Sequence, residues 1–445
     1  MNNQKQAKVD LTGLNHVVDL VEESFLKYSE CPAFSCLGQT LTYNDIDKKS
    51  KALAIYFQQH AQLKSGDKIA LVLPNLIQFP IAAYAALRAG LTIVNTNPLY
   101  TEREMRHQFV DAQVSAVVIL ADLLPKLAAV LSDTNIVNVV ITQATDLLKP
   151  DNESIAFSSE HTQVTSIGFN QAIAYGEHGA LLPIKRSQLD DIAVLQYTGG
   201  TTGLSKGAML THRNLLANVQ QAGDRFNPVT VEREEIIVCP LPLYHIYAFL
   251  INLLLAPAQG SLNILIPNPR DLEAFVTAIR PFPFSIFTGI NTLFVSLCHH
   301  SAFKKLDFST LKLTLSGGSA LTGNAANLWQ EYTGCTVSEG YGLSETSPVL
   351  CFNPPGQECL GTIGWPLIDT IIEIWDDNHQ CVAQGEVGEI VAKGPQVMKG
   401  YWQQPQATAA AIINGFFKTG DLGCILADGR IKIVDRKKDM IIVSG

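Results

Sequence analysis

Helical and strand-like patterns alternate along the chain between residues 42 and 120. An amphipathic run from Tyr43 to His60 precedes an apolar run at 68–73, and a second helical run from Phe79 to Arg88 precedes the short apolar run 92–95. Strands that alternate with helices favour a parallel sheet covered by helices, because parallel neighbours need a crossover connection. The chain is therefore predicted to be an α/β protein.

The same texture returns from residue 192 to about Glu345 and then gives way to short alternating strands with Gly and Asp turns from about Gly361. We therefore expect two α/β subdomains with mixed, largely parallel sheets, at about 1–190 and 191–350. A smaller β-barrel lobe is expected at about 351–437.

Composition and charge narrow the class of protein. With 445 residues, 47% of them apolar and 16% charged, the chain can bury a large core. A net charge of −9 argues against nucleic acid as a partner, since binding a duplex needs a dense basic surface. The nine cysteines show no C-x-x-C pair, so neither a zinc site nor a disulfide framework is indicated. The N-terminus leads into no apolar signal segment, and the longest apolar run, Ile246–Ala258, is too short to span a bilayer, so a cytoplasmic protein is expected.

A run rich in glycine and hydroxyl groups follows the apolar stretch 191–196. It carries the glycines Gly199, Gly200, Gly203 and Gly207, the hydroxyls of Thr198, Thr201, Thr202 and Ser205, and the charge of Lys206. Glycine backbone can approach an anion closely, and the hydroxyls and the lysine add donors and charge, so the run predicts a phosphate loop. It differs from a Walker A loop because Lys206 is followed by Gly207. The alternative is a flexible linker, which has no use for a lysine held between apolar segments.

Weaker motifs follow downstream. His245 lies between tyrosines on a kinked apolar segment, where a packed core histidine is the alternative. The run Ser316–Ala320 offers bare backbone to a flat ring or is a simple tight turn. Tyr341 can stack on a base, and Glu345 either suits Mg²⁺, which prefers oxygen ligands, or caps a helix. Asp421 and Arg436 can bind ribose hydroxyls, or are solvated charges in turns.

Taken in this order, the motifs resemble those of the adenylate-forming acyl-CoA synthetases. From about residue 14 to residue 445 the chain is similar to the bacterial long-chain fatty acid CoA ligases. The resemblance implies an ATP-dependent ligase that activates a long-chain fatty acid as an acyl-adenylate and transfers the acyl group to CoA, with Mg²⁺ as the metal. It implies catalytic roles for Lys206, His245 and Glu345 and Mg²⁺ ligation by Thr201 and Glu345. It implies acyl binding by His245, Tyr247 and Gly289, and nucleotide binding by Thr198, Gly199, Gly200, Thr201, Thr202, Gly203, Lys206, Gly317, Gly318, Ser319, Tyr341, Gly342, Thr346, Asp421 and Arg436.

Departures from the family pattern are small within the motifs. Gly199 stands where threonine is also common, Ser205 where proline is common and Ser344 where threonine is usual, and none removes a needed functional group. Lys438 matches the family's hinge, so we expect residues 1–437 to be the AMP-binding N-terminal domain and 438–445 to begin a C-terminal domain that is missing. The chain alone is then expected to lack full activity.

Two rival interpretations stay open. One is an adenylate-forming ligase for another carboxylic acid, such as an aryl-CoA ligase or an amino-acid adenylation domain, although no acidic residue near His245 would meet an ammonium group. The other is a nucleotide- or lipid-binding remnant without catalysis. The sequence also leaves open a homodimer and a peripheral contact with the inner membrane face, where a fatty acid substrate partitions.

Overall fold

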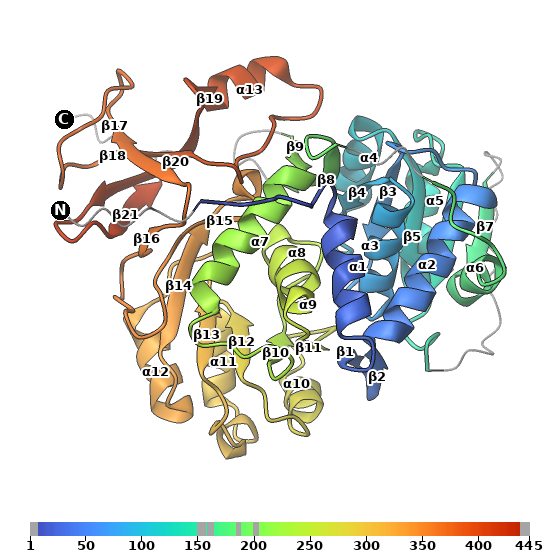
Figure 1. Ribbon diagram of the computed structural model, residues 1–445, viewed down its shortest axis with the longest axis horizontal. Coiled ribbons are helices and arrows are strands. Elements are labelled where there is room, and N and C mark those ends of the chain that lie inside the picture. Colours follow the sequence, from blue (N-terminus) through green and yellow to red (C-terminus); the bar gives the residue numbers. More distant parts are fainter. Residues whose placement is uncertain (1–7, 149–156, 158–163, 184–187, 199–203, 437–445) are drawn as a thin grey trace.

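The computed structural model describes residues 8–148, 157, 164–183, 188–198 and 204–436. Within these residues the strands form three sheets, two rich in parallel pairs and one antiparallel. Figure 1 shows two α/β bodies side by side and a smaller lobe, drawn in orange and red, above one of them. The predicted fold class is confirmed.

The first sheet has the strand order β7-β6-β5-β3-β4-β8-β9, and its pairs are parallel except for β8 with β9. The helices α2, α3 and α6 pack against one another beside it. Its elements are α2 (Tyr43–Gln59), β3 (Lys68–Val72), α3 (Gln78–Arg88), β4 (Thr92–Asn95), α4 (Glu102–Asp111), β5 (Val114–Leu120), η1 (Ala121–Leu123), α5 (Leu124–Leu131), β6 (Asn138–Thr142), β7 (Thr165–Gly168), α6 (Phe169–Gly176), β8 (Ile192–Thr198) and β9 (Lys206–Thr211).

The second sheet has the order β16-β15-β14-β13-β12-β10-β11-β1-β2, parallel from β14 to β1 and antiparallel at both ends. Its strands are β1 (Pro32–Cys36), β2 (Gln39–Thr42), β10 (Ile236–Cys239), β11 (Leu262–Leu265), β12 (Ile286–Gly289), β13 (Leu313–Ser316), β14 (Val337–Gly342), β15 (Val349–Phe352) and β16 (Trp365–Pro366). Each of the first two sheets thus contains strands from both sides of residue 190, and the subdomain boundaries stay predictions.

The helices around the second sheet include one short π-helical segment, η2 (Ile251–Leu255), which continues directly from α8. A buried aromatic cluster of Phe287, Phe294, Phe303 and Trp329 packs below this sheet. The remaining helices are α1 (Val17–Lys27), α7 (His212–Phe226), α8 (Ile246–Leu250), α9 (Ala256–Ala258), α10 (Leu272–Ile279), α11 (Asn291–His299), η3 (Phe303–Lys305), α12 (Gly323–Thr333) and η4 (Ser344–Thr346).

The third sheet is antiparallel and belongs to the smaller lobe. Its strands are β17 (Ile371–Trp375), β18 (Gly388–Lys393), β19 (Ile412–Ile413), β20 (Phe416–Ile425) and β21 (Ile431–Arg436), and α13 (Pro405–Ala411) precedes β19. Among the described residues, no helix combines the length and the apolar character needed to cross a bilayer.

The helix starts follow from local capping chemistry. The Thr101 hydroxyl oxygen accepts a hydrogen bond from the backbone N–H of Glu104, and the Glu104 carboxylate accepts one from the backbone N–H of Thr101. This is the capping box that the sequence pattern predicts, and it satisfies donors that a helix start otherwise leaves open. Thr211 and Asn214 form the same arrangement at the start of α7. That helix crosses the centre of the molecule in Figure 1, drawn in green.

Candidate functional site

A cavity of about 1260 Å³ opens where the three sheets meet. It exceeds the roughly 300–1,000 Å³ that is usual for a single small ligand, so it has room for more than one substrate. Its lining includes Thr198 and Lys206 from the first sheet, Tyr341 from the second with Gly317 directly after β13, and Asp421 from the third. Most of the predicted site residues that the structure describes therefore lie around one space.

The predicted phosphate loop connects two strands of a hairpin. β8 ends at Thr198, β9 begins at Lys206, and these two residues are cross-strand partners. Lys206 thus belongs to a strand rather than to the loop itself, and its backbone is fixed by strand pairing. The predicted residues Gly199, Gly200, Thr201, Thr202 and Gly203 lie outside the described residues.

Gly207, the next residue of β9, lies directly against an aromatic ring. A Cβ atom at this position would come within 3.1 Å of the Tyr197 ring, which is closer than ordinary packing allows. The Tyr197 hydroxyl in turn donates a hydrogen bond to Asp111 Oδ2 at 2.5 Å. Glycine at this position therefore lets the Tyr197 ring pack closely beside Lys206.

Glu345 is a buried carboxylate in the short helix η4, with 8% of its surface exposed. The Tyr401 hydroxyl donates a hydrogen bond to Glu345 Oε1 at 2.9 Å. Burial raises the pKa of Glu345, and the opposing influences are the hydrogen bond from Tyr401, the charge of Lys206 and a hydrogen bond involving Thr198. A carboxylate that faces the cavity, stabilised as an anion by its neighbours, is a suitable oxygen ligand for Mg²⁺.

The charge of the site also suits Mg²⁺. Among the described residues, no group of three or more His, Cys, Asp or Glu side chains could hold a metal by itself. Mg²⁺ commonly binds to only one or two carboxylates and completes its shell with water and substrate phosphates. Glu345 lines the same cavity as Lys206, and a single cavity-lining carboxylate fits that mode.

Two predicted nucleotide-binding residues stabilise the turn around Glu345. Thr346 is fully buried and lies outside the cavity lining, and its hydroxyl lies within hydrogen-bonding distance of both Pro348 O and Leu343 O, to one of which it can donate its single proton. Gly342 lines the cavity, but a Cβ atom there would lie 1.8 Å from Pro348 O. The requirement for glycine at this position is therefore at least partly structural.

The run after β13 lines the same cavity as Tyr341. Gly318 has φ of +81°, a conformation that side chains other than glycine rarely adopt, and a Cβ atom on Gly317 would come within 3.2 Å of the Tyr247 ring. These two glycines and Ser319 all line the cavity.

Asp421 and Arg436 are cross-strand partners on β20 and β21, which explains why residues separated in sequence act at one place. Arg436 Nε lies 3.5 Å from Asp421 Oδ1, and the Tyr341 hydroxyl donates to Asp421 Oδ2 at 2.5 Å. Asp421 thus links the small lobe to the second sheet at the edge of the cavity.

His245 is the N-cap residue of α8, and its Nδ1 accepts a hydrogen bond from Tyr247 N at 3.4 Å. Although the side chain of His245 is exposed to the open cavity, desolvation by the surrounding protein lowers its pKa. The neutral ring that results carries its proton on Nε2, because Nδ1 is the acceptor.

His245 and Tyr247 both line the cavity, whereas Gly289 does not. A Cβ atom on Gly289 would clash with the Phe294 ring at 2.6 Å, so this glycine serves the aromatic cluster and gains no support as an acyl contact.

Two hydrogen-bonded amide side chains, which no sequence motif indicates, lead to the residue before His245. Asn95 donates from Nδ2 to Gln196 Oε1 at 3.0 Å, and Gln196 donates from Nε2 to Tyr244 O at 3.2 Å. All three residues line the cavity. These hydrogen bonds connect β4 and β8 to the segment just before His245. Isolated amides in apolar strands give no sequence motif, although Asn95 is the last residue of β4.

Tyr401 is a further cavity residue that the sequence motifs do not indicate, and it lies in the segment 395–402. This segment pairs with β9: Met209 N donates to Gly400 O, Lys399 N donates to Met209 O and Trp402 N donates to Gly207 O, at 2.9, 3.0 and 2.8 Å. We call residues 395–402 the tyrosine strap. The aromatic pair Tyr401-Trp402 is its only sequence signal.

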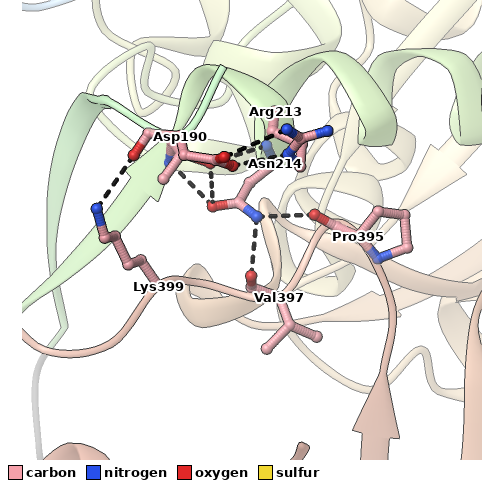
Figure 2. Close-up of polar contacts among 7 residues, drawn as sticks. Asp190, Arg213, Asn214, Pro395, Val397 and Lys399 are labelled. Carbon is pink, nitrogen blue, oxygen red and sulfur yellow. Dashed lines mark hydrogen bonds and ion pairs between the residues drawn. The ribbon is translucent and has the colours of Figure 1, made fainter. Parts of the chain in front are cut away.

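Figure 2 shows how the start of the tyrosine strap is fastened. Asn214 Nδ2 donates to Pro395 O at 2.7 Å and to Val397 O at 2.8 Å, while its Oδ1 accepts from Thr211 in the capping box of α7. Lys399 Nζ donates to Asp190 O at 3.2 Å, and Asp190 pairs with Arg213. The first turn of α7 thus holds the strap beside β9.

Comparisons with known proteins agree with this geometry. The model of the family described as AMP-binding enzyme matches residues 21–402. A long-chain-fatty-acid–CoA ligase from Salmonella typhimurium is 40% identical over 451 residues, covering 99% of this chain and 80% of that protein. A solved anthranilate CoA ligase in complex with anthranoyl-AMP has a TM-score of 0.87 at 20% identity, covering 97% of this chain and 79% of the other. A solved long-chain-fatty-acid–CoA ligase from Archaeoglobus fulgidus has a TM-score of 0.80 at 22% identity, covering 95% and 84%.

Proposed function

The chain belongs to the AMP-binding enzyme family, and on that premise we propose that it is an ATP-dependent ligase for long-chain fatty acids. The proposed reaction first converts the fatty acid to an acyl-adenylate with release of pyrophosphate, and CoA then takes the acyl group with release of AMP. The 40% identity to a long-chain-fatty-acid–CoA ligase supports this choice of substrate.

The observation that carries the proposal is that one cavity combines phosphate-binding charge with an apolar wall. Lys206 and Glu345 line it together with six apolar residues that are brought near one another from α7, η2, β15 and the segment after β16. These are Ala222, Phe226, Ile251, Val349, Phe352 and Leu367. Each methylene group buried against such a wall contributes about 0.8 kcal/mol, so a long alkyl chain gains more than a short one.

The first step is a problem of negative charge. A carboxylate oxygen of the fatty acid attacks the α-phosphorus of ATP, and the bond to the bridging oxygen breaks as pyrophosphate leaves with the electron pair. Lys206 Nζ meets the phosphate charge, and Asp421 and Arg436 are proposed to hold the ribose. Glu345, and by prediction Thr201, would hold Mg²⁺, whose charge would offset that of the phosphate oxygens. Neutral His245 is proposed to donate from Nε2 to the acyl carboxylate and to orient it.

In the second step the CoA sulfur forms a bond to the acyl carbonyl carbon, and the bond from that carbon to the AMP oxygen breaks. The predicted hinge at Lys438 and a further C-terminal domain concern residues beyond those described, and both stay predictions, as does partial activity of this chain alone. The cytoplasmic location, a homodimer and a peripheral membrane contact also stay predictions.

The proposal is tested by exchange of labelled pyrophosphate into ATP, which reports the first step without CoA. We expect palmitate or oleate to stimulate exchange more strongly than acetate or benzoate. Preference for benzoate or another aryl acid would favour the rival ligase, and ATP binding without exchange for any acid would favour the non-catalytic remnant.

A further inference from the structure

Tyr401 touches both charged groups of the phosphate site. Its hydroxyl donates to Glu345 Oε1 at 2.9 Å, and Lys206 Nζ lies 5.2 Å from the centre of its ring, within the range of a cation–π contact. All three side chains line the cavity. Tyr401 therefore contacts the side chains that the proposed function assigns to the phosphates and to the metal.

Lys206 and Glu345 are near enough to influence each other but are not paired. The positive charge of Lys206 lowers the pKa of Glu345, yet no ion pair within 4.0 Å joins Lys206 to a carboxylate in the described part of the chain. Opposite charges in a site shielded from water attract strongly. Tyr401 offers each of them a different contact: the hydroxyl holds the carboxylate, and the ring face holds the ammonium group.

The backbone around Tyr401 is fixed from several sides. The tyrosine strap pairs with residues 207–209 of β9, directly after Lys206. Met398 N donates to Glu345 O at 2.8 Å, and Tyr401 N donates to Thr408 Oγ1 at 2.9 Å. The strap is thus hydrogen-bonded to the segments that carry Lys206 and Glu345. The backbone of Tyr401 is therefore held in a fixed position between these two side chains.

We propose that Tyr401 is a positioning residue that keeps Lys206 and Glu345 apart and directed into the cavity before Mg²⁺ and ATP bind. The inference rests on the proposed function, because it gives Lys206 the phosphates and Glu345 the metal. The hydroxyl and the ring have separable tasks. The hydroxyl orients the carboxylate for the metal, and the ring prevents the lysine from collapsing onto that carboxylate.

The two tasks are separated by the variants Tyr401→Phe and Tyr401→Ala. We would measure ATP affinity by titration calorimetry in Mg²⁺ and again in excess EDTA. Loss of a hydrogen bond to a charged group is expected to weaken binding of Mg²⁺ and ATP by Tyr401→Phe about tenfold, with little change in EDTA. Tyr401→Ala is expected to weaken binding under both conditions, because Lys206 then pairs with Glu345. A crystal structure of Tyr401→Ala should show these two side chains within 4 Å.

The chain offers a matched control. The hydroxyl of Tyr332 accepts a hydrogen bond from Lys304 at 3.0 Å, and Lys304 Nζ also lies 4.3 Å from its ring centre, outside the cavity lining. Tyr332→Phe is expected to leave ATP binding unchanged. Thermal melting of each variant would establish that it is folded.

Two results would overturn the inference. One is binding by Tyr401→Phe within twofold of wild type in Mg²⁺, and the other is an equal loss with and without Mg²⁺. A double-mutant cycle adds a second criterion: in a Glu345→Gln background, Tyr401→Phe should have no further effect. These are nucleotide-binding measurements and need no acyl substrate, so failure of fatty acid-dependent exchange would count against the proposed function alone.

Discussion

The position of each functional side chain in this site is set by contacts with neighbouring residues. Lys206 is placed by strand pairing, Glu345 by the turn that Gly342 and Thr346 stabilise, and Asp421 by its cross-strand partner Arg436. The backbone pairing that places Lys206 does not involve its charge, whereas the carboxylates of Glu345 and Asp421 also accept hydrogen bonds from Tyr401 and Tyr341. Charge and fold are therefore most clearly separable at Lys206.

We predict that Lys206→Ala slows pyrophosphate exchange by roughly 10²–10³, because it removes one preorganised stabiliser of developing phosphate charge. The free energy of unfolding should change by less than about 1 kcal/mol, since Lys206 has no carboxylate partner within 4.0 Å among the described residues and its cation–π contact with Tyr401 is worth about 0.5–1 kcal/mol. Exchange assays and urea unfolding would test both parts. A loss of activity that tracks a loss of stability would assign Lys206 a structural role instead.

The limits of the sequence analysis are also clearest at the residue scale. Lys206, Glu345 and Asp421 stand in local motifs, and the structure brings all three to the cavity. Tyr401 contacts Glu345 across a sequence separation of 56 residues, so no local spacing could indicate the pair. Thr346 and Gly289 belong to motifs or runs that were assigned to ligands, but their close neighbours are backbone carbonyls and an aromatic ring.

At the scale of elements, the alternation of helices and strands was readable because each element carries its own periodicity. The run Tyr43–His60 forms α2 at Tyr43–Gln59, and the run 68–73 forms β3 at Lys68–Val72. Which sheet each strand joins was not readable, because β1 pairs with β11 far along the chain. The tyrosine strap was missed for the same reason, since its partners are in β9 and α7.

Asn214 is the residue that joins these elements, and we predict that Asn214→Ala lowers the free energy of unfolding by about 2–4 kcal/mol. The change leaves Pro395 O and Val397 O without their donor, and an unsatisfied buried group costs about 1–3 kcal/mol. Urea unfolding would measure the effect. Arg213→Ala is the control: it removes an exposed ion pair with Asp190 from the same turn and should cost about 0–1 kcal/mol. Equal effects of the two substitutions would contradict the assigned role of Asn214.

At the scale of the whole molecule, a buried histidine pair joins the start of α1 to the start of α7. The rings of His16 and His212 lie 3.5 Å apart between centroids, and each residue is 3% exposed. Val17 N donates to His212 Nδ1 at 3.3 Å. Burial, and then the neighbouring His16, lower the pKa of His212 to about 2, so the folded protein holds this ring neutral.

The pair makes stability depend on pH in a definite direction. The unfolded chain binds a proton at His212 below pH 6.5, the ordinary value, whereas the folded chain does so only near pH 2, so acid favours unfolding across this window. Between pH 7.5 and pH 5.5 we expect His212 to account for a loss of about 1 kcal/mol of unfolding free energy. Urea unfolding of wild type and of His212→Gln at both pH values would measure the contribution of His212, as the difference between the two proteins in how much unfolding free energy they lose. An identical pH dependence in the two proteins would exclude it.

Because three sheets form one cavity, a ligand that fills this cavity can bind only the fully folded protein. Lys206, Tyr341 and Asp421 come from different sheets, so the binding space exists only after all three have docked. A nucleotide that contacts all three residues would act as a reversible cross-link, because it would bind the fully folded protein and not partly folded states. At a concentration 100 times its dissociation constant, such a ligand would add about 2.7 kcal/mol to the stability of the finished fold. Substrate supply would then govern how long this protein survives as well as how fast it works.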